Sequence, residues 1–315
     1  MKIVMLDAGT LGADVDLSPV TALGDTVVYQ STGADDVILR LADADVAVLN
    51  KIKMTREVLE AAPPLKLICV TATGYDNIDL ACCRERGITL CNVPAYSTDS
   101  VAQLTLSMAL SLATHLPAYH AYVHGGSYTA SGMANHLTPV YHELSSMTWG
   151  VIGGGNIGAQ VARVAAAFGC RVLVCRRKSD PFYETVDIDT LCRESDIISV
   201  HLPLTPETRG IVSRERIAIM KRNAIFINVA RGAVTDEEAL AEAIEQERLG
   251  GIGIDVFTTE PFSATHPFSR ILNRENVCLT PHMAWGSFEA RTRCLAVVAD
   301  NISCYFAGKT QNKIV

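Results

Sequence analysis

The sequence predicts an α/β protein built from two doubly wound parallel sheets. Short β-type runs alternate with helical stretches along most of the chain, which is typical of βαβ units. At 315 residues the chain is long enough for two such domains. Its composition, 49% hydrophobic and 19% charged residues, is that of a globular protein without a disordered tract.

The first half of the chain shows this alternation without a phosphate-binding loop. Strands are expected at Lys2–Asp7, Thr26–Tyr29, Val46–Leu49, Lys66–Val70 and Thr89–Cys91, with helices around Ala34–Leu41, Arg56–Ala62 and Leu80–Arg86. Thr55 is placed as an N-cap for the second of these helices, and Gly87 stands where a C-terminal glycine belongs. Because the other half contains the glycine loop described below, the first half is expected to hold a different ligand.

The middle of the chain interrupts the alternation. Asn92–Thr98 predicts a hinge, and a helix over about Ser100–Leu116, ended by Pro117, is apolar around much of its surface. Such a helix is expected to be buried in a core or against a second subunit. The less regular segment Ala118–Glu143 is expected to be a polar loop or a subunit-contact arm. We therefore expect a homodimer.

The second half resumes the alternation. Strands are expected at Thr148–Ile152, Arg171–Cys175, Ile197–Val200, Ala224–Asn228, Gly251–Val256 and Val277–Thr280. Thr235 and Glu238 predict a capping box for a helix that runs to Glu247. The amphipathic last helix, about Phe288–Phe306, is expected to pack on the first domain. The predicted domains are residues 1–98 plus 287–315, which bind substrate, and residues 99–286, which bind a dinucleotide.

One stretch carries the clearest functional signal. The run Thr148–Ile152 leads into Gly153, Gly155 and Gly158, which have the spacing GxGxxG, and a helix and a second strand follow. This is the context that a dinucleotide pyrophosphate site requires. The glycines would permit a tight turn, a close approach of the phosphates and tight helix packing at a helix N-terminus. We predict a Rossmann dinucleotide-binding domain, although a glycine-rich loop without a ligand also fits GxGxxG alone.

Composition excludes several other classes of protein. The net charge of -7 argues against nucleic-acid binding, because phosphate contacts need clustered Lys and Arg. No run of roughly eighteen apolar residues occurs, so no membrane span is expected. Met1–Asp7 has the pattern of a strand rather than of a signal peptide, and we expect a cytoplasmic protein.

Cysteine and histidine spacing gives no metal signal. The 10 cysteines show no zinc-finger spacing, and Cys82 and Cys83 are adjacent, so we interpret the cysteines as small apolar residues in a reducing compartment. His120 and His124 are one helical turn apart, but no Cys or carboxylate pattern supports a metal site there.

Candidate catalytic residues follow predicted strands of the second half. Arg231, Glu260 and His282 each lie beyond a strand, and ligands of open parallel sheets bind at the carboxyl ends of strands. Arginine offers a fork of donors suited to a carboxylate, histidine exchanges protons near neutral pH, and a neighbouring carboxylate favours imidazolium. Singly, each residue is equally compatible with a solvated charge or a cap.

These motifs resemble the D-isomer-specific 2-hydroxyacid dehydrogenase family over nearly the whole chain. The matching stretches are Ala72–Asp79, Asn92–Gln103, the glycine loop, His201–Gly210, Asn228–Gly232, Asp255–Pro261 and Pro281-His282 with Trp285. Asn50-Lys51 and Trp285 are most similar to the glycerate dehydrogenase and hydroxypyruvate (glyoxylate) reductase branch.

The resemblance implies roles for individual residues. Arg231 would bind the substrate carboxylate and polarise the carbonyl, His282 would act as acid and base, and Glu260 would be its partner. Lys51, Thr73 and Gly74 would join Arg231 and His282 around the substrate. The implied cofactor-binding residues are Gly153, Gly155, Asn156, Ile157, Gly158, His201, Pro203, Thr208, Val229, Ala230, Arg231, Asp255 and His282, with Asp255 holding the nicotinamide carboxamide.

Cofactor preference depends on a departure from the family pattern. Members that use NAD place an acidic residue after the second strand, where it binds the ribose 2′-hydroxyl, but this chain has Arg176, followed by Arg177 and Lys178. Guanidinium groups suit a 2′-phosphate, so we predict that NADP is preferred over NAD. In the alternative, the basic side chains face solvent and Asp180 turns back to hold the ribose.

The sequence therefore predicts NAD(P)H-dependent reduction of a small 2-oxoacid, such as hydroxypyruvate or glyoxylate, to the D-2-hydroxyacid. Two alternatives stay open. A dinucleotide-sensing corepressor of the same fold could keep the catalytic residues. A phosphoglycerate dehydrogenase would need extra basic residues for the phosphate, and the first half shows no such cluster.

Overall fold

The computed structural model describes every residue, Met1–Val315, and the chain forms two compact units. The first unit comprises Met1–Ser97 and Trp285–Val315, and the second comprises Thr98–Ala284. The first unit is therefore discontinuous in sequence, because its last helix follows the whole of the second unit. The division of substrate and dinucleotide between the two units remains a prediction.

The first unit is a five-stranded parallel sheet in the order β2-β1-β3-β4-β5. Its strands are β1 (Lys2–Met5), β2 (Asp25–Val28), β3 (Val46–Leu49), β4 (Leu67–Val70) and β5 (Thr89–Cys91). The strands β3 and β4 are buried at every position. This is the continuous apolar pattern of a parallel sheet that is covered on both faces.

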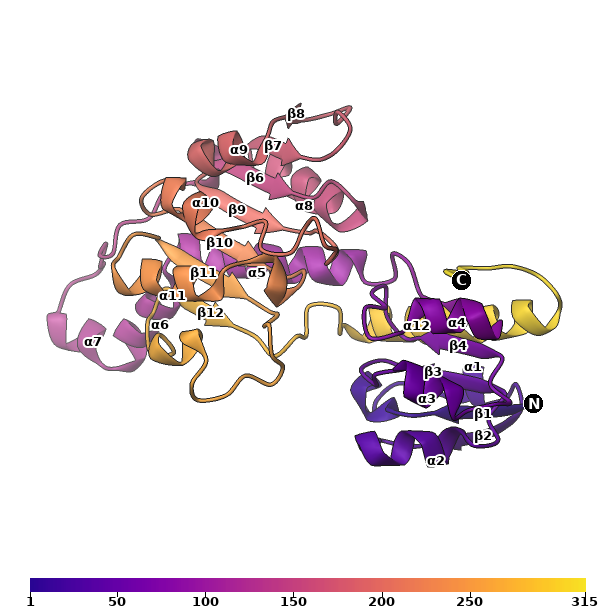
Figure 1. Ribbon diagram of the computed structural model, residues 1–315. Coiled ribbons are helices and arrows are strands. Elements are labelled where there is room, and N and C mark those ends of the chain that lie inside the picture. The colour runs from indigo at the N-terminus through magenta and orange to yellow at the C-terminus, as the bar shows by residue number, and fades with distance from the viewer. The chain divides into compact units, whose positions relative to one another are not determined.

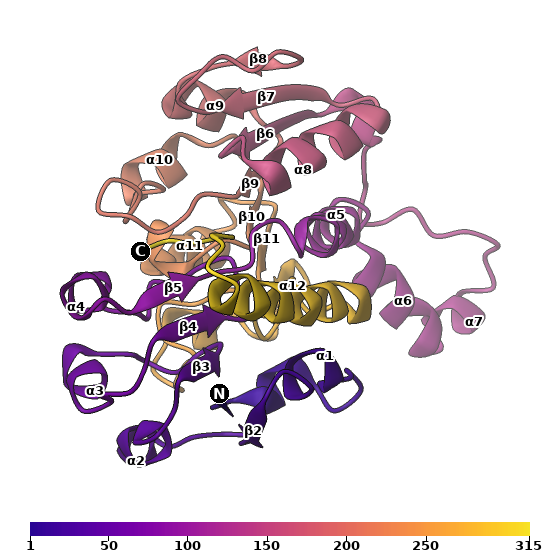
Figure 2. The ribbon, with the colours of Figure 1, turned by 90° about the vertical axis from the view of Figure 1, so that its right-hand side faces the viewer.

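Helices cover both faces of this sheet. Figure 2 shows α1 (Ser18–Thr21) and α12 (Phe288–Phe306) on one face, and α2 (Val37–Leu41), α3 (Arg56–Glu60) and α4 (Leu80–Arg86) on the other. Two 3₁₀ turns complete the unit, η1 (Ala8–Leu11) and η2 (Ala34–Asp36). The predicted signals at helix ends are confirmed. The Thr55 side chain accepts a hydrogen bond from the Val58 N–H, and Gly87 ends α4 with a φ of 68°.

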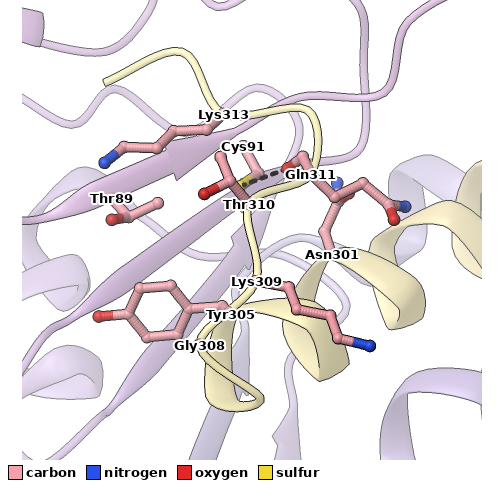
Figure 3. A pocket seen from close by; sticks show the side chains of 9 residues that line it. All are labelled: Thr89, Cys91, Asn301, Tyr305, Gly308, Lys309, Thr310, Gln311 and Lys313. Atoms are coloured by element: carbon pink, nitrogen blue, oxygen red, sulfur yellow. Dashed lines mark hydrogen bonds between the residues drawn. The ribbon is translucent and has the colours of Figure 1, made fainter.

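The C-terminal tail closes the β5 edge of the sheet. Ile314 donates its backbone N–H to the Leu90 carbonyl at 2.8 Å, and the Cys91 thiol donates to the Gln311 carbonyl at 3.4 Å. Figure 3 shows the hollow beneath this tail, which is lined mostly by polar side chains. The side chains of Lys309 and Lys313 point in different directions there, so the two ammonium groups do not converge on one point.

The second unit is a seven-stranded parallel sheet in the order β12-β11-β10-β9-β6-β7-β8 (Figure 1). Its strands are β6 (Thr148–Ile152), β7 (Arg171–Cys175), β8 (Glu184–Thr185), β9 (Ile197–Val200), β10 (Ile225–Asn228), β11 (Gly251–Ile254) and β12 (Val277–Leu279). This is the strand order of a Rossmann fold with one further strand. The direction of winding reverses between β6 and β9, which is where such sheets bind ligands.

The helices of the second unit also lie on both faces of its sheet. Figure 2 shows α5 (Thr98–Ala113) and α8 (Asn156–Ala167) on one side, and α9 (Ile188–Glu194), α10 (Arg214–Ile219) and α11 (Glu237–Glu245) on the other. The 3₁₀ turns are η3 (Leu144–Ser146), η4 (Gly232–Val234) and η5 (Pro267–Arg270). Trp149 and Phe226 are fully buried in its core.

The apolar helix differs from its predicted limits. It ends at Ala113 rather than Leu116, and Pro117 lies in the first turn of the next helix, α6 (Leu116–His124). Proline suits that position because the N–H that it lacks would have no intrahelical partner there. One face of α5, which includes Met108 and Leu112, is buried in its own unit.

The segment after α5 projects from the second unit (Figure 2), and most of its residues are exposed. It contains α6 and the short helix α7 (Ser127–Ser131). We call residues 116–141 the arm. Its exposed apolar side chains include Leu116, Val123, Met133, Leu137, Val140 and Tyr141.

Two further features of the second unit differ from the sequence prediction. The N-cap of α11 is Asp236, which accepts from the Ala239 N–H, so the capping box of Thr235 and Glu238 was wrong. Thr235 instead accepts a hydrogen bond from the Asn228 side chain. The short edge strand β8 was not predicted, because two residues carry too little pattern to be recognised.

The cysteines are all free. Most are buried, and burial raises the pKa of the Cys192 and Cys294 thiols to about 12. They therefore remain thiols and pack as small apolar residues, as predicted. None of the helices combines the length and the hydropathy that crossing a membrane requires.

Candidate active site

The glycine loop has the backbone geometry that close packing against a ligand requires. Gly153 has a φ of 101°, and a Cβ on Gly158 would lie 1.8 Å from the Gly153 carbonyl oxygen. Both positions therefore need glycine, one for its dihedral angle and one for its contact. By contrast, a Cβ on Gly155 would meet nothing within 4 Å, so the space beside this residue is open to a ligand.

The helix that follows the loop presents its N-terminus without a side-chain cap. Gly155 is the N-cap of α8, and Asn156 and Ile157 open the helix. The first N–H groups of a helix have no intrahelical acceptor, and together with the helix dipole they favour an anion. These residues fit the pyrophosphate of a dinucleotide.

His201 directly follows β9, and the glycine loop follows the neighbouring strand β6. The two therefore lie on either side of the point where the direction of winding reverses. Trp149 donates its indole N–H to the Ser199 hydroxyl at 3.0 Å, and the same hydroxyl lies 3.0 Å from His201 Nε2. Because the hydroxyl accepts from tryptophan, its own proton is available to His201 Nε2. The remaining His201 proton then lies on Nδ1, which is buried and has no partner in the protein. Burial lowers the pKa of His201 to about 3.

Arg176 lies directly against the glycine loop. A Cβ on Gly154 would lie 2.8 Å from Arg176 Cδ. Its Nη1 donates to Asp180 Oδ2 at 2.8 Å, and the Asp180 side chain is only 6% exposed. Burial opposes ionisation of Asp180, but hydrogen bonds from the Phe182 backbone and from Arg176 outweigh it and lower the pKa of this carboxyl group. Arg177, in contrast, is exposed.

The turn that carries Arg231 is built by a buried side chain at the end of β10. Asn228 is 1% exposed, its Nδ2 donates to the Arg231 carbonyl at 2.9 Å, and its Oδ1 accepts from the Ala230 N–H at 3.0 Å. The Arg231 side chain donates to the Ala230 carbonyl at 2.8 Å. The backbone at this turn is therefore fixed by the strand that precedes it.

His282 and Glu260 form a hydrogen-bonded pair within the second unit. The His282 Nδ1 lies 2.6 Å from Glu260 Oε2, and both side chains remain partly exposed. Glu260 Oε1 also accepts the Phe257 N–H at 3.0 Å, which orients the carboxylate. With Nδ1 directed to Glu260, His282 Nε2 is the ring nitrogen predicted to exchange a proton with a substrate.

Asp255 shapes the turn that carries His282. Its carboxylate accepts from the Thr280 hydroxyl at 2.5 Å, the Met283 N–H at 2.8 Å and the Ala284 N–H at 2.9 Å. These bonds hold a turn in which His282 has a φ of 54°. Burial is the main influence on Asp255 and raises its pKa, although these hydrogen bonds oppose the rise. Asp255 is fully buried, and its contact with a nicotinamide carboxamide remains a prediction.

The predicted substrate residues of the first unit lie after β3 and β4. Asp7 accepts the backbone N–H groups of Asn50 and Lys51, which fixes the Lys51 turn. Burial raises the pKa of Asp7, while these backbone hydrogen bonds lower it in part. Thr73 donates its hydroxyl to the Val93 carbonyl at 2.8 Å, and Gly74 follows on an accessible turn.

The remaining predicted cofactor residues lie on loops at the ends of β9 and β10. Thr208 accepts the Thr205 N–H at 2.7 Å and donates to the Pro203 carbonyl at 2.6 Å, so it holds its loop together. Val229 and Ala230 follow β10 directly. No group of His, Cys, Asp and Glu side chains is arranged to hold a metal ion.

Comparison with known proteins identifies the family. A profile described as "D-isomer specific 2-hydroxyacid dehydrogenase, NAD binding domain" matches residues 106–284, which is more than half of the chain. The chain belongs to the D-isomer-specific 2-hydroxyacid dehydrogenase family. The resemblance seen in the motifs is thereby confirmed.

Individual relatives of this family extend over the whole chain. A hydroxypyruvate reductase from Blautia hydrogenotrophica is 35% identical and covers 100% of this chain and 99% of its own. A glycerate dehydrogenase from Methylorubrum extorquens is 34% identical, with 99% and 98% covered. Among solved structures, an acyclic imino acid reductase in complex with NADPH and D-Arg has a TM-score of 0.87 at 29% identity, with both chains covered completely.

Sequence reasoning missed several residues that shape the site. Asn228 lies in a stretch that matches the family, but its role in the Arg231 turn was not predicted, and no role was predicted for the buried Glu237 and His266. Glu237 has the pattern of an ordinary acidic residue in a first helical turn, and His266 that of a loop histidine before proline. No signal in the sequence shows that these two side chains meet, because they are far apart along the chain.

Proposed function

We propose that this chain reduces a small 2-oxoacid to the corresponding D-2-hydroxyacid with a reduced nicotinamide dinucleotide. The observation that carries the proposal is the pair of His282 and Glu260, joined at 2.6 Å beyond the strands of a dinucleotide-binding fold. The names of the relatives, hydroxypyruvate reductase and glycerate dehydrogenase, support the substrate class.

Each residue of the proposed site has a defined task. A reduced nicotinamide dinucleotide, held at the glycine loop of Gly153, Gly155 and Gly158, would supply the hydride for the carbonyl carbon. His282 Nε2 gives a proton to the carbonyl oxygen, and Glu260 stabilises the imidazolium that carries this proton. Arg231 binds the substrate carboxylate through its fork of donors. Backbone N–H groups near Thr73 and Gly74, together with Lys51, would complete recognition of the carboxylate.

We propose further that NADP is preferred over NAD. Arg176 lies against the glycine loop, at the end of the strand that adjoins the adenosine ribose in this fold. Its guanidinium is paired with Asp180, so a 2′-phosphate would have to take the place of this carboxylate. NAD remains the alternative, with Asp180 as the group that holds the ribose.

We also propose a homodimer formed through the arm and α5. Leu137 and Val140 are each 71% exposed, and further apolar side chains of the arm lie near them in sequence. A second copy of the chain would cover this apolar surface, and two-fold dimers are the commonest closed assemblies.

Turnover measurements test the activity. The purified chain is assayed with glyoxylate, hydroxypyruvate, pyruvate and phosphohydroxypyruvate, each with NADH and with NADPH, and the configuration of the product is determined by chiral chromatography. We expect oxidation of the cofactor and a D product with an unphosphorylated 2-oxoacid. Cofactor binding without turnover of any oxoacid would favour the corepressor alternative. A preference for the phosphorylated acid would favour phosphoglycerate dehydrogenase.

A further inference from the structure

A buried carboxylate links the turn of Arg231 to the loop of Glu260. Glu237 is the first residue of α11 and is 8% exposed. Its Oε1 accepts the Thr258 N–H at 2.9 Å, and its Oε2 accepts the Thr258 hydroxyl. Thr258 lies two residues before Glu260 in the loop that follows β11. The hydrogen bonds to Glu237 therefore fix the start of this loop.

A histidine completes this buried cluster. His266 Nε2 lies 3.0 Å from Glu237 Oε2, and His266 Nδ1 accepts the Phe268 N–H at 3.3 Å. Because Nδ1 accepts a hydrogen bond, the ring proton lies on Nε2 and is donated to Glu237. The ring packs against Phe257, Phe262 and Phe268, with centroids 6.0, 4.9 and 5.1 Å away. Glu237 thus ties down both ends of the segment that carries Glu260.

A second contact joins the same two segments. Gly232 directly follows Arg231, and a Cβ on this glycine would lie 2.1 Å from the Phe257 carbonyl carbon and 2.3 Å from the Thr258 nitrogen. The two backbones therefore touch at this point. Arg231 lies in the connection between β10 and α11, and Glu237 is the first residue of α11. This short stretch of chain therefore contains the Arg231 turn and also binds the loop that carries Glu260.

We propose that Glu237, with Thr258 and His266, is a positioning cluster that sets the Glu260 carboxylate against His282. It acts through the 257–266 loop, because Phe257 donates its N–H to Glu260 and Thr258 is bound by Glu237. The expected effect on kcat rests on the proposed function, because His282 and Glu260 transfer a proton only if the protein reduces an oxoacid. A carboxylate is needed because Glu237 accepts from three donors, and an amide offers only one oxygen.

The kinetic test compares Glu237→Gln with two controls. Glu238→Gln is the same change on the adjacent exposed residue, which pairs with Arg270 at the surface. Asp236→Ala removes the N-cap of the same helix and lowers its stability without touching the loop. We expect Glu237→Gln to lower kcat by roughly 10–100-fold, the scale of a small misplacement of catalytic groups, with little change in cofactor Kd. Neither control should lower kcat by more than about twofold.

A double variant decides whether Glu237 acts through Glu260. We expect Glu237→Gln combined with Glu260→Gln to be no slower than Glu260→Gln alone, because the cluster has nothing left to position. If the two losses multiply, or if Glu237→Gln retains the kcat of the unmutated protein, the inference is wrong. If Glu237→Gln fails to fold, Thr258→Val takes its place, because it removes the hydrogen bond from the Thr258 hydroxyl to Glu237. Its kcat is compared with those of the same controls and of its double variant with Glu260→Gln.

A structural readout separates this inference from the proposed function. In a crystal structure of the ligand-free Glu237→Gln or Thr258→Val chain, we expect the Nδ1–Oε2 bond between His282 and Glu260 to be lost. In Glu238→Gln it should be retained. Retention in both cluster variants would overturn the positioning role, whatever substrate the protein acts on. Failure of every oxoacid to turn over would overturn the proposed function alone.

Discussion

His282 Nδ1 and Glu260 Oε2 lie 2.6 Å apart, although the two residues follow different strands of the second sheet. The contact directs Nδ1 of the His282 ring to the Glu260 carboxylate. It also gives the imidazolium form a counter-charge at a partly exposed position.

Removal of His282 should abolish acid–base catalysis. We expect His282→Ala to lower kcat by about 10²–10⁴-fold, the range for a lost general acid, with cofactor Kd nearly unchanged. Steady-state kinetics and fluorescence titration of the cofactor measure the two quantities. Arg222→Ala, at an exposed arginine of the same unit outside the arm, is the control. Turnover near that of the unmutated protein would remove His282 from the mechanism.

Glu260→Gln should change the pH dependence of reduction. Reduction requires imidazolium, and Glu260→Gln removes the negative charge that stabilises the charged ring. The pH range in which kcat/KM for the oxoacid stays high should therefore end at a lower pH. Profiles of kcat/KM against pH for this variant and for Glu238→Gln provide the check. Superimposable profiles would show that Glu260 does not support the charged ring.

Arg231→Lys should impair substrate recognition even though it keeps the positive charge. Lysine lacks the planar fork that meets both oxygens of a carboxylate, so KM for the oxoacid should rise and kcat/KM should fall, by about tenfold or more if one charge-assisted hydrogen bond is lost. Arg222→Lys, at an exposed arginine of the same unit, controls for the change of residue type. Equal kinetics in both variants would mean that Arg231 supplies only a general positive field.

The arm should carry the dimer contact. We expect the protein to sediment as a dimer at micromolar concentration, and Leu137→Asp with Val140→Asp to shift it towards monomer, because charges would be buried in the interface. Leu39→Asp is the control, since Leu39 is 76% exposed on α2 in the other unit. A monomer before mutation would contradict the proposal.

Arg176 and Asp180 should set cofactor preference in opposite directions. Hydrogen bonds to charged groups are worth about 1.5–3 kcal/mol, so Arg176→Asp should weaken NADPH binding by roughly 10–100-fold and improve NADH binding. Asp180→Asn should instead strengthen NADPH binding, because it frees Arg176 from its partner.

Calorimetric titration with both cofactors measures these effects, and Arg222→Asp controls for a change of net charge. Equal kcat/KM for NADH and NADPH in the unmutated protein would contradict the preference. Loss of NADH affinity in Asp180→Asn would show that this carboxylate holds the ribose.

The sequence by itself determined the fold class, most strand positions and the family. These follow from local rules, because a buried parallel strand reads as an apolar run and the turn at Gly153 and the contact at Gly158 require glycine. The sequence also indicated Arg231, Glu260 and His282 as candidate catalytic residues, because each follows a strand and ligands bind at the carboxyl ends of strands.

Only the tertiary structure decided which side chains meet. The pairing of Glu260 with His282, the bond of Arg176 to Asp180 and the buried cluster of Glu237 with His266 depend on how loops return to the sheet. The N-cap of α11 shows the same limit, because Asp236 and Thr235 are equally suitable caps in sequence. Asn228 engages Thr235, Asp236 caps the helix, and the Glu237 that follows is buried.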